Sequence, residues 1–122
     1  MRLKGSRTED ALRKAFAREV HVHAVYSYFA KAAREAGLDQ IADIFSATAG
    51  NEAEHAAHEF RFLDGLGNTE ANLKLAVGRE HEEADKLYPE AAQIAEEEGF
   101  NEIADFRDRF SRAEYSNYAR FL

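Results

Sequence analysis

The sequence predicts an all-α protein built from four long helices. Apolar residues recur every three or four positions through four stretches, and no window alternates with a period of two. The chain has 122 residues with only one proline and seven glycines, so few positions are available for turns. Its hydrophobic content of 45% is enough for a core, and residues 1–122 are expected to form a single domain.

The first half of the chain contains signals for two helices. Ser6 and Glu9 have the spacing of a capping box, and apolar periodicity continues from there up to Gly37, a favourable residue just beyond a helix end. A second helix is expected over residues 39–63. The turn sequence Asp-Gly-Leu-Gly at 64–67 should stop it.

The second half of the chain contains signals for two more helices. Thr69 is expected to cap a third helix, which runs to about Glu98 and ends at Gly99. Asn101 is expected to cap a fourth, which reaches the C-terminus. Almost no residues remain for strands, so the prediction is a bundle of helices.

The two halves are similar to each other, over residues 7–64 and 69–122. An offset of 62 residues places glycine on glycine and acid on acid. The matched pairs are Gly37 with Gly99, Glu52 with Glu114, Tyr26 with Tyr88, and Ile41-Ala42-Asp43 with Ile103-Ala104-Asp105. Two similar helical hairpins with glutamates at matched depth predict a pseudo-twofold site between them.

The third helix contains one residue more than the first. Arg18-Glu19 match Arg79-Glu80 at an offset of 61 rather than 62, so the extra residue lies between Glu80 and Tyr88. A single insertion inside a helix is usually absorbed as a π-bulge, and such bulges are frequent at functional sites. We therefore expect a π-bulge in this part of the third helix.

Composition excludes several classes of function. The net charge of −7 argues against a nucleic-acid partner, which normally meets a basic face. The absence of cysteine excludes a disulfide framework, an iron–sulfur cluster and a rubredoxin-type metal site within these residues. The opening MRLKGSRTED has no apolar run, and no stretch approaches membrane-spanning length, so a cytoplasmic protein without a membrane partner is expected.

Carboxylates and one histidine are placed as metal ligands. Di-iron carboxylate bundles use one Glu from each of two helices and Glu-x-x-His from each of the other two. The expected helices supply Glu19, then Glu52-x-x-His55, then Glu80-x-x-Glu83, and finally Glu114. The one departure is Asn117, the repeat mate of His55, where that rule expects histidine.

These residues also have simpler interpretations. A single Glu-x-x-His on a helix is weak evidence, and REHEEADK around Glu80 can be read as a solvated charged face. The paired glutamates of the repeat favour a buried site, because burying several carboxylates without metal costs several kcal/mol each. His23, one turn beyond Glu19, and Asn117, through its carbonyl, are candidates for extra or replacement ligands.

Several segments resemble the erythrin domain of the rubrerythrins, over nearly the whole chain. They are LKGSRTEDALRKAFARE, YSYFAKAAREAG, NEAEH, GREHEEADKLYPE and IAEEEGFNEIADF. The resemblance is to the sulerythrin-like form without a rubredoxin domain. It implies a ferritin-like four-helix bundle with two iron ions, with manganese, a mixed iron–manganese pair or zinc as alternatives.

The resemblance also implies roles for individual residues. The implied metal ligands are Glu19, Glu52, His55, Glu80, Glu83 and Glu114. Tyr26 and Tyr88 are implied to hydrogen-bond ligand carboxylates. The family pattern Glu-x-x-His is replaced at its last occurrence by Glu-Tyr-Ser-Asn, which ends at Asn117.

The implied function is that of a rubrerythrin-like peroxidase. Two ferrous ions would reduce hydrogen peroxide, and a separate rubredoxin-like protein would act as electron donor. The alternatives are an oxidase or ferroxidase that uses dioxygen, and a metal-binding or storage bundle without turnover.

Chain length predicts a domain-swapped homodimer. In a ferritin-like bundle the second and third helices run parallel, so the chain must return about 34 Å between Glu52 and Glu80. The five Cα steps from Asp64 to Thr69 span at most about 18 Å. Either the helices form a simple up-down-up-down bundle, or the hairpins of two chains exchange, and the resemblance favours exchange.

Overall fold

The computed structural model describes residues 2–122, and within them all regular structure is helical. The chain divides into two compact units, one ending at Leu66 and the other starting at Gly67. This boundary falls between the two halves of the sequence repeat. The predicted single domain, of which residue 1 lies outside the described residues, stays a prediction.

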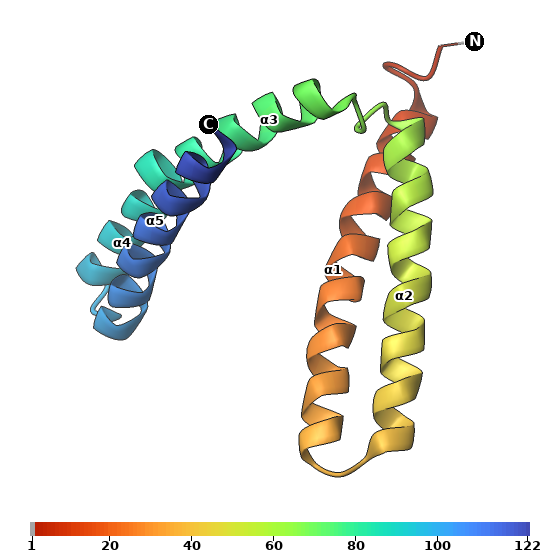
Figure 1. Cartoon of the computed structure of the whole chain (residues 1–122), viewed down its shortest axis with the longest axis horizontal. Coiled ribbons are helices and arrows are strands. Elements are labelled where there is room, and N and C mark those ends of the chain that lie inside the picture. The colour runs from red at the N-terminus through yellow and green to blue at the C-terminus, as the bar shows by residue number, and fades with distance from the viewer. Residues whose placement is uncertain (1) are drawn as a thin grey trace. The chain divides into compact units, whose positions relative to one another are not determined.

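The first unit is an antiparallel hairpin of two long helices. Figure 1 shows α1 (Arg7–Glu35) beside α2 (Asp39–Phe62) along their whole length. The capping box is present in part: Ser6 Oγ accepts from the backbone N–H of Glu9 at 3.0 Å, but the Glu9 carboxylate accepts from Gly5 rather than from Ser6. The cap therefore starts α1 where the sequence predicts.

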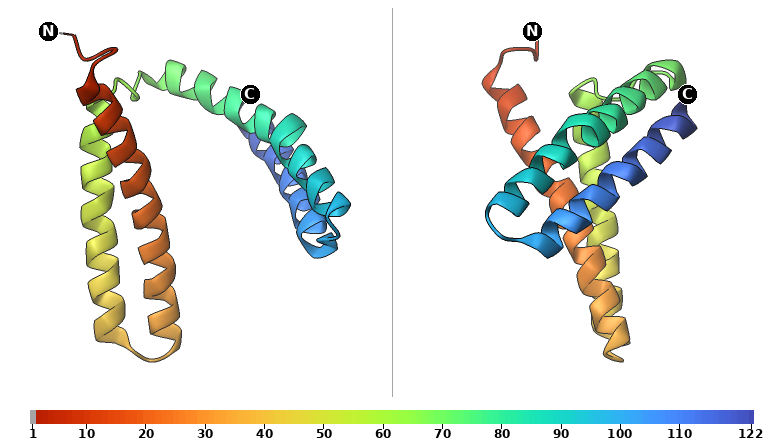
Figure 2. Two further views of the ribbon diagram at one scale, coloured as in Figure 1. Left: turned by 180° about the vertical axis from the view of Figure 1, so that it is seen from behind. Right: turned by 90° about the vertical axis from the view of Figure 1, so that its left-hand side faces the viewer.

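The second unit repeats this hairpin. It contains α3 (Thr69–Glu82), a π-helical turn η1 (Glu83–Leu87), α4 (Tyr88–Glu97) and α5 (Asn101–Phe121). The first three elements are continuous, and together they form the predicted third helix. Both views of Figure 2 show α5 alongside this continuous helix.

The predicted π-bulge is confirmed at the predicted place. The backbone N–H of Tyr88 donates to the carbonyl of Glu83, five residues back rather than four. Pro89 follows directly. Because proline has no N–H and its ring clashes with the carbonyl four residues back, a widened turn before it relieves that clash.

The two hairpin turns have the same conformation. Gly37 and Gly99 have φ of +78° and +86°, values that suit glycine because it has no Cβ. The next residues, Leu38 and Phe100, both have ψ of 66°, and both donate their N–H to a carbonyl five residues back. This is the Schellman pattern expected after Gly37 and Gly99.

Two predicted caps are wrong by one residue. Asn68, not Thr69, caps α3: its side chain accepts from the N–H of Ala71 at 2.9 Å. Phe100 occupies the cap position of α5 without a side-chain bond, and Asn101 is already helical. The Schellman turn brings the chain directly from α4 into α5. Backbone hydrogen bonds, rather than a side-chain cap, therefore stabilise the start of α5.

Small residues form the interface within each hairpin. Ala42, Ala49 and Ala56 recur every seven residues on α2 and are nearly fully buried, and Ala104 and Ser111 continue the pattern on α5. Small side chains let two helices approach closely. Large apolar side chains on the same elements stay exposed, among them Ile41, Ile44, Phe29, Ile94, Ile103 and Phe106.

Exposed apolar faces on both hairpins favour further packing. A helix that is polar on only part of its circumference normally buries the remaining stripe against another element. No described helix is long and apolar enough to cross a membrane.

Candidate metal centre

The first ligand group is assembled by α1 and α2. Ligand atoms of Glu19, Glu52 and His55 all lie within 4.8 Å of one another. Glu52 and His55 are three residues apart on one face of α2, and His55 Nδ1 is 3.7 Å from Glu52 Oε1. The Glu52 side chain is 25% exposed and the His55 ring 58% exposed, so the imidazole is accessible to a metal from solvent.

The second ligand group is assembled at the π-helical turn. Ligand atoms of Glu80, Glu83 and Glu114 also lie within 4.8 Å of one another, and all three residues are half-buried. Glu80 and Glu83 share a face of the helix by their spacing of three, and α5 supplies Glu114. In a regular α-helix the inserted residue would rotate everything after it by about 100°. The π-helical turn absorbs that rotation, and Tyr88 packs against Phe110 of α5.

An unsatisfied acceptor in the first group fits a bound cation. Glu19 Oε2 has less than 1 Å² of accessible surface and no hydrogen-bond partner among the described residues. A buried carboxylate oxygen without a donor costs free energy unless a proton or a metal binds it. Mixed carboxylate and imidazole donors suit iron or manganese. The residues present therefore fit the implied metals.

Asn117 contacts the second group through hydrogen bonds. Its Nδ2 donates to Glu80 Oε2 at 3.5 Å and to Glu114 Oε2 at 3.4 Å. The amide thus joins two of the three carboxylates at the position where His55 stands in the first group. Its role as a metal ligand stays a prediction.

The candidate ligand His23 is oriented by the backbone. Its Nδ1 lies 2.8 Å from the carbonyl oxygen of Ala49, so Nδ1 donates a hydrogen bond to that oxygen. Metal-binding histidines often use such a bond to hold the ring. His23 belongs to neither ligand group, and its predicted role as an extra ligand stays a prediction.

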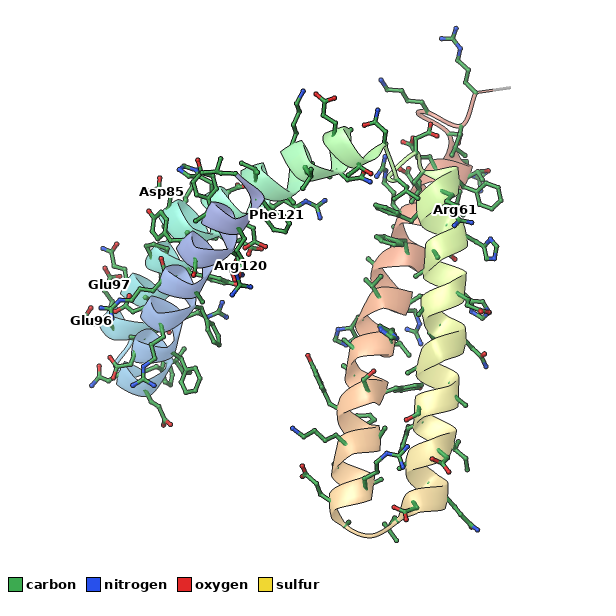
Figure 3. The ribbon with its side chains drawn as sticks, in the orientation of Figure 1. Arg61, Asp85, Glu96, Glu97, Arg120 and Phe121 are labelled. Carbon is green, nitrogen blue, oxygen red and sulfur yellow. The ribbon has the colours of Figure 1, made fainter. Side chains whose placement is uncertain are left out.

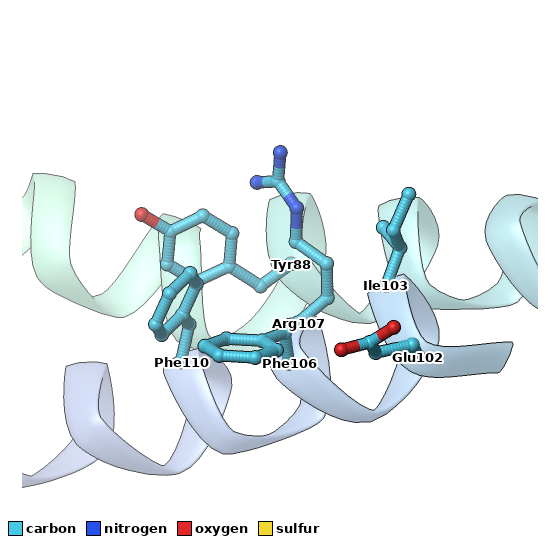
Figure 4. Close-up of a pocket in the computed structure, with 6 residues that line it drawn as sticks. All are labelled: Tyr88, Glu102, Ile103, Phe106, Arg107 and Phe110. Carbon is cyan, nitrogen blue, oxygen red and sulfur yellow. The ribbon is translucent and has the colours of Figure 1, made fainter. Parts of the chain in front are cut away.

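Tyr26 and Tyr88 lie in aromatic surroundings. The Tyr26 ring packs edge-on against Phe45 at 5.7 Å. The Tyr88 ring packs against Phe110 at 5.9 Å, and the guanidinium of Arg107 lies 5.5 Å from its centre, at a surface hollow of about 380 Å³ (Figure 4). Among residues 2–122 neither hydroxyl bonds a carboxylate, so those predicted bonds remain untested.

One acidic residue near the first group was not singled out by the sequence. Glu59 lies one turn beyond His55, and its carboxyl is within hydrogen-bonding reach of Glu19. Burial is the main cause that raises the pKa of Glu59, and the Glu19 carboxylate adds to it. The repeat gave no signal here, since the mate of Glu59 is Phe121. The signal that could have identified Glu59 was its spacing on one helix face, seven residues after Glu52 and four after His55.

A tyrosine neighbouring the second group bonds the π-helical turn. Tyr115 Oη donates to Asp85 Oδ1 at 2.8 Å; Asp85 is labelled in Figure 3. The bond to this carboxylate is the main cause that raises the pKa of Tyr115, because the protonated phenol donates it and ionisation would remove it.

These helices and ligand groups define a class: all-α proteins that arrange carboxylates and imidazole for divalent metal ions. Comparison with known proteins names the family within this class. The Rubrerythrin family model matches residues 10–122. The chain belongs to the rubrerythrin family, which confirms the all-α, ferritin-like fold class predicted from the sequence.

Two rubrerythrins from other organisms agree with this assignment. The chain is 40% identical to rubrerythrin of Porphyromonas gingivalis, over 98% of this chain and 66% of that protein. It is 41% identical to rubrerythrin of Nitratidesulfovibrio vulgaris, over 98% of this chain and 70% of that protein. A solved structure of nigerythrin in a mixed-valence state is 31% identical, covers 98% of this chain and 68% of its own, and aligns with a TM-score of 0.45. The chain thus spans about two thirds of the length of these relatives.

Proposed function

We propose that this chain is a non-haem di-iron oxidoreductase that reduces hydrogen peroxide with electrons from a separate donor. The metal ligands in this proposal are Glu19, Glu52, His55, Glu80, Glu83 and Glu114. The observation that carries the proposal is the pair of ligand groups at matching positions of the two hairpins. Membership of the rubrerythrin family supports iron as the metal.

Electrostatics support a cation at both groups. Two carboxylates at 4.8 Å repel each other by roughly 1–3 kcal/mol, between the limits for bulk water and for a protein surface. Among the ion pairs of residues 2–122, none joins one of these carboxylates to a lysine or arginine that would offset the repulsion. A divalent cation removes the repulsion and satisfies the buried Glu19 oxygen.

Two ferrous ions held by these residues would supply the two electrons that, with two protons, convert hydrogen peroxide to two water molecules. The chain's residues position the metals and the reactant. Carboxylates of both hairpins would hold the ions, together with the imidazole of His55. We propose that the hydroxyls of Tyr26 and Tyr88 bond carboxylates across the assembled site.

Assembly of one centre from both groups requires two chains in this proposal. With α2 and α3 parallel, α2 rises about 15 Å from Glu52 to Phe62, and α3 rises about 16 Å from Thr69 to Glu80, together about 31 Å. The seven Cα steps from Phe62 to Thr69 span at most about 25 Å. A bond from the Gly65 N–H to the Phe60 carbonyl shortens that reach further.

A domain-swapped homodimer solves this length problem. The first hairpin of one chain packs on the second hairpin of its partner, and each of two sites takes one ligand group from each chain. The exposed apolar residues of the hairpins supply the surface for this packing.

The electron donor lies outside these 122 residues, since they contain no cysteine to form a rubredoxin-type centre. A rubredoxin-like protein is the donor that we propose.

A second candidate function is metal binding without turnover. The observation that favours it is Asn117, whose amide bonds Glu80 and Glu114 where the other group has an imidazole. Loss of that nitrogen ligand weakens binding of the metal and changes its redox properties.

Single-turnover kinetics distinguish the candidates. The anaerobic protein is loaded with two ferrous ions per chain and mixed with one equivalent of peroxide or with dioxygen. A peroxidase oxidises both ions rapidly with peroxide and slowly with dioxygen. Faster oxidation by dioxygen identifies an oxidase or ferroxidase, and slow oxidation by both identifies a binding protein.

A further inference from the structure

Glu59 extends the stripe of ligands on α2. It follows Glu52 by seven residues and His55 by four, so the three side chains lie on one face of the helix. Its carboxyl reaches Glu19 on α1 and interacts electrostatically with both Glu52 and His55. Glu59 is therefore a direct neighbour of Glu19 and extends the group beyond the ligand atoms of Glu19, Glu52 and His55, which lie within 4.8 Å of one another.

The Glu59 carboxylate, like that of Glu19, has an unsatisfied oxygen with almost no accessible surface. Glu59 Oε2 and Glu19 Oε2 each have less than 1 Å² of accessible surface, and within residues 2–122 neither has a hydrogen-bond partner. Ionised carboxylates only accept, so these two satisfy each other only if they share a proton, whereas a cation satisfies both. The stacked rings of Phe16 and Phe60, 5.2 Å apart, place apolar surface one residue from Glu59.

A purely structural role for Glu59 would require it to share a proton with Glu19. Buried acids in a structural role normally pair with a lysine or arginine, or accept several N–H bonds. The ion pairs of the described residues include neither Glu59 nor Glu19. Two buried oxygens without donors, beside an imidazole and another carboxylate, are what a metal ion satisfies.

We propose that Glu59 is a metal ligand of the first group, in addition to Glu19, Glu52 and His55. The inference rests on the proposed metal centre and assigns that group a fourth donor. The first group then supplies three carboxylates and an imidazole, whereas the second supplies three carboxylates without one. Glu59 thus adds a donor in a chain that lacks the imidazole at Asn117.

A fourth donor in the first group makes the two ligand groups unequal in their affinity for a divalent metal ion. Four donors, one of them nitrogen, bind a divalent cation more tightly than three carboxylates, two of which already accept from the Asn117 amide. Metal therefore loads in two steps, with the first equivalent at the Glu59 group.

Calorimetric titration of the full chain with Mn²⁺ tests this order. Glu59→Gln keeps the shape and removes the charge, and Glu59→Leu removes both oxygens. Both variants should weaken the tighter binding step at least about tenfold, as loss of a metal-site partner commonly does. Glu54→Gln, an exposed acid on the same helix, is the matched control and should leave both steps unchanged.

Thermal melting separates a ligand from a structural residue. Without metal, Glu59→Gln removes the repulsion between the Glu59 and Glu19 carboxylates and should melt at a higher temperature than the parent. With saturating Mn²⁺ it should gain less stability than the parent. A structural acid would lower both melting temperatures together, and that result would overturn the proposal.

The calorimetric Mn²⁺ titration can give three outcomes, and each has a different meaning. Weakened binding in both Glu59 variants supports the ligand role. Unchanged binding in them, with loss of binding in Glu52→Gln, overturns the role of Glu59 and leaves the metal centre intact. A parent chain that binds no Mn²⁺ overturns Glu59 and the metal centre together.

Discussion

The hydroxyl of Ser111 donates a hydrogen bond to the backbone carbonyl of Ala84, inside the π-helical turn. In the π pattern this carbonyl would accept from residue 89, but Pro89 has no N–H. Ala84 is completely buried, so water cannot replace that donor. Ser111 on α5 therefore satisfies a carbonyl that the insertion and the proline leave free.

Substitution of Ser111 by alanine tests this bond. Ser111→Ala leaves the buried Ala84 carbonyl unpaired, and we expect a loss of about 1–3 kcal/mol in the free energy of unfolding, measured with urea. Ser116→Ala, at an exposed position of the same helix, should change it little. Equal stability of the two variants would mean that Ser111 does not support the turn.

Metal removal should lower the melting temperature. A ligand that binds only the folded state adds about 2.7 kcal/mol when present at 100 times its dissociation constant. Glu52→Gln should lose most of this gain, because it removes a ligand charge. Calorimetry with Mn²⁺ and with a chelator measures both effects. Identical melting of chelated and loaded protein would contradict a buried metal site.

Mixing two variants tests the exchanged dimer. In a swapped homodimer of Glu52→Gln, both metal sites contain a damaged first ligand group. In a homodimer of Glu114→Gln, both metal sites contain a damaged second ligand group. After joint unfolding and refolding, a swapped heterodimer has one site with both defects and one intact site. We expect tight metal binding at about one site per heterodimer. Sedimentation should show a dimer at micromolar concentration, whereas a metal-loaded monomer would indicate the up-down-up-down bundle.

Restoring the imidazole should strengthen the second group. Asn117→His places a nitrogen ligand three residues after Glu114, the spacing of Glu52 and His55. We expect the weaker Mn²⁺ binding step to tighten about tenfold or more. The same change at exposed Ser116 is the control, because its side chain points away from Glu114. No gain over that control would mean that position 117 does not face the metal.

The bond between Tyr115 and Asp85 predicts a pH effect. The carboxylate raises the phenol pKa above its ordinary value of 10.0, so the folded state holds this proton more tightly than the unfolded state. The stability from the bond is present below the ordinary pKa and is lost as the pH rises through the folded-state pKa. Asp85→Asn should lower the Tyr115 pKa in an ultraviolet titration, with Tyr115→Phe identifying the signal. An unchanged titration would contradict the bond.

Much of the fold was predictable because its signals are local. Glycines at 37 and 99 mark turns that require positive φ, and the change of offset from 62 to 61 located the π-helical turn. Apolar periodicity identified each helix. Cap positions at Asn68 and Phe100 were missed, since neighbouring polar residues offer equivalent caps and the turn geometry selects one.

The sequence by itself determined the helices, the repeat and six of the candidate ligands, since each follows from spacing along one chain. Only the tertiary structure decided which side chains meet across a hairpin. Contacts such as Ser111 with Ala84, His23 with Ala49 and Glu59 with Glu19 join residues 26 to 40 positions apart, and they depend on the register of two packed helices. That register is set by alanines that let the backbones approach, and a periodic pattern does not specify it to one residue.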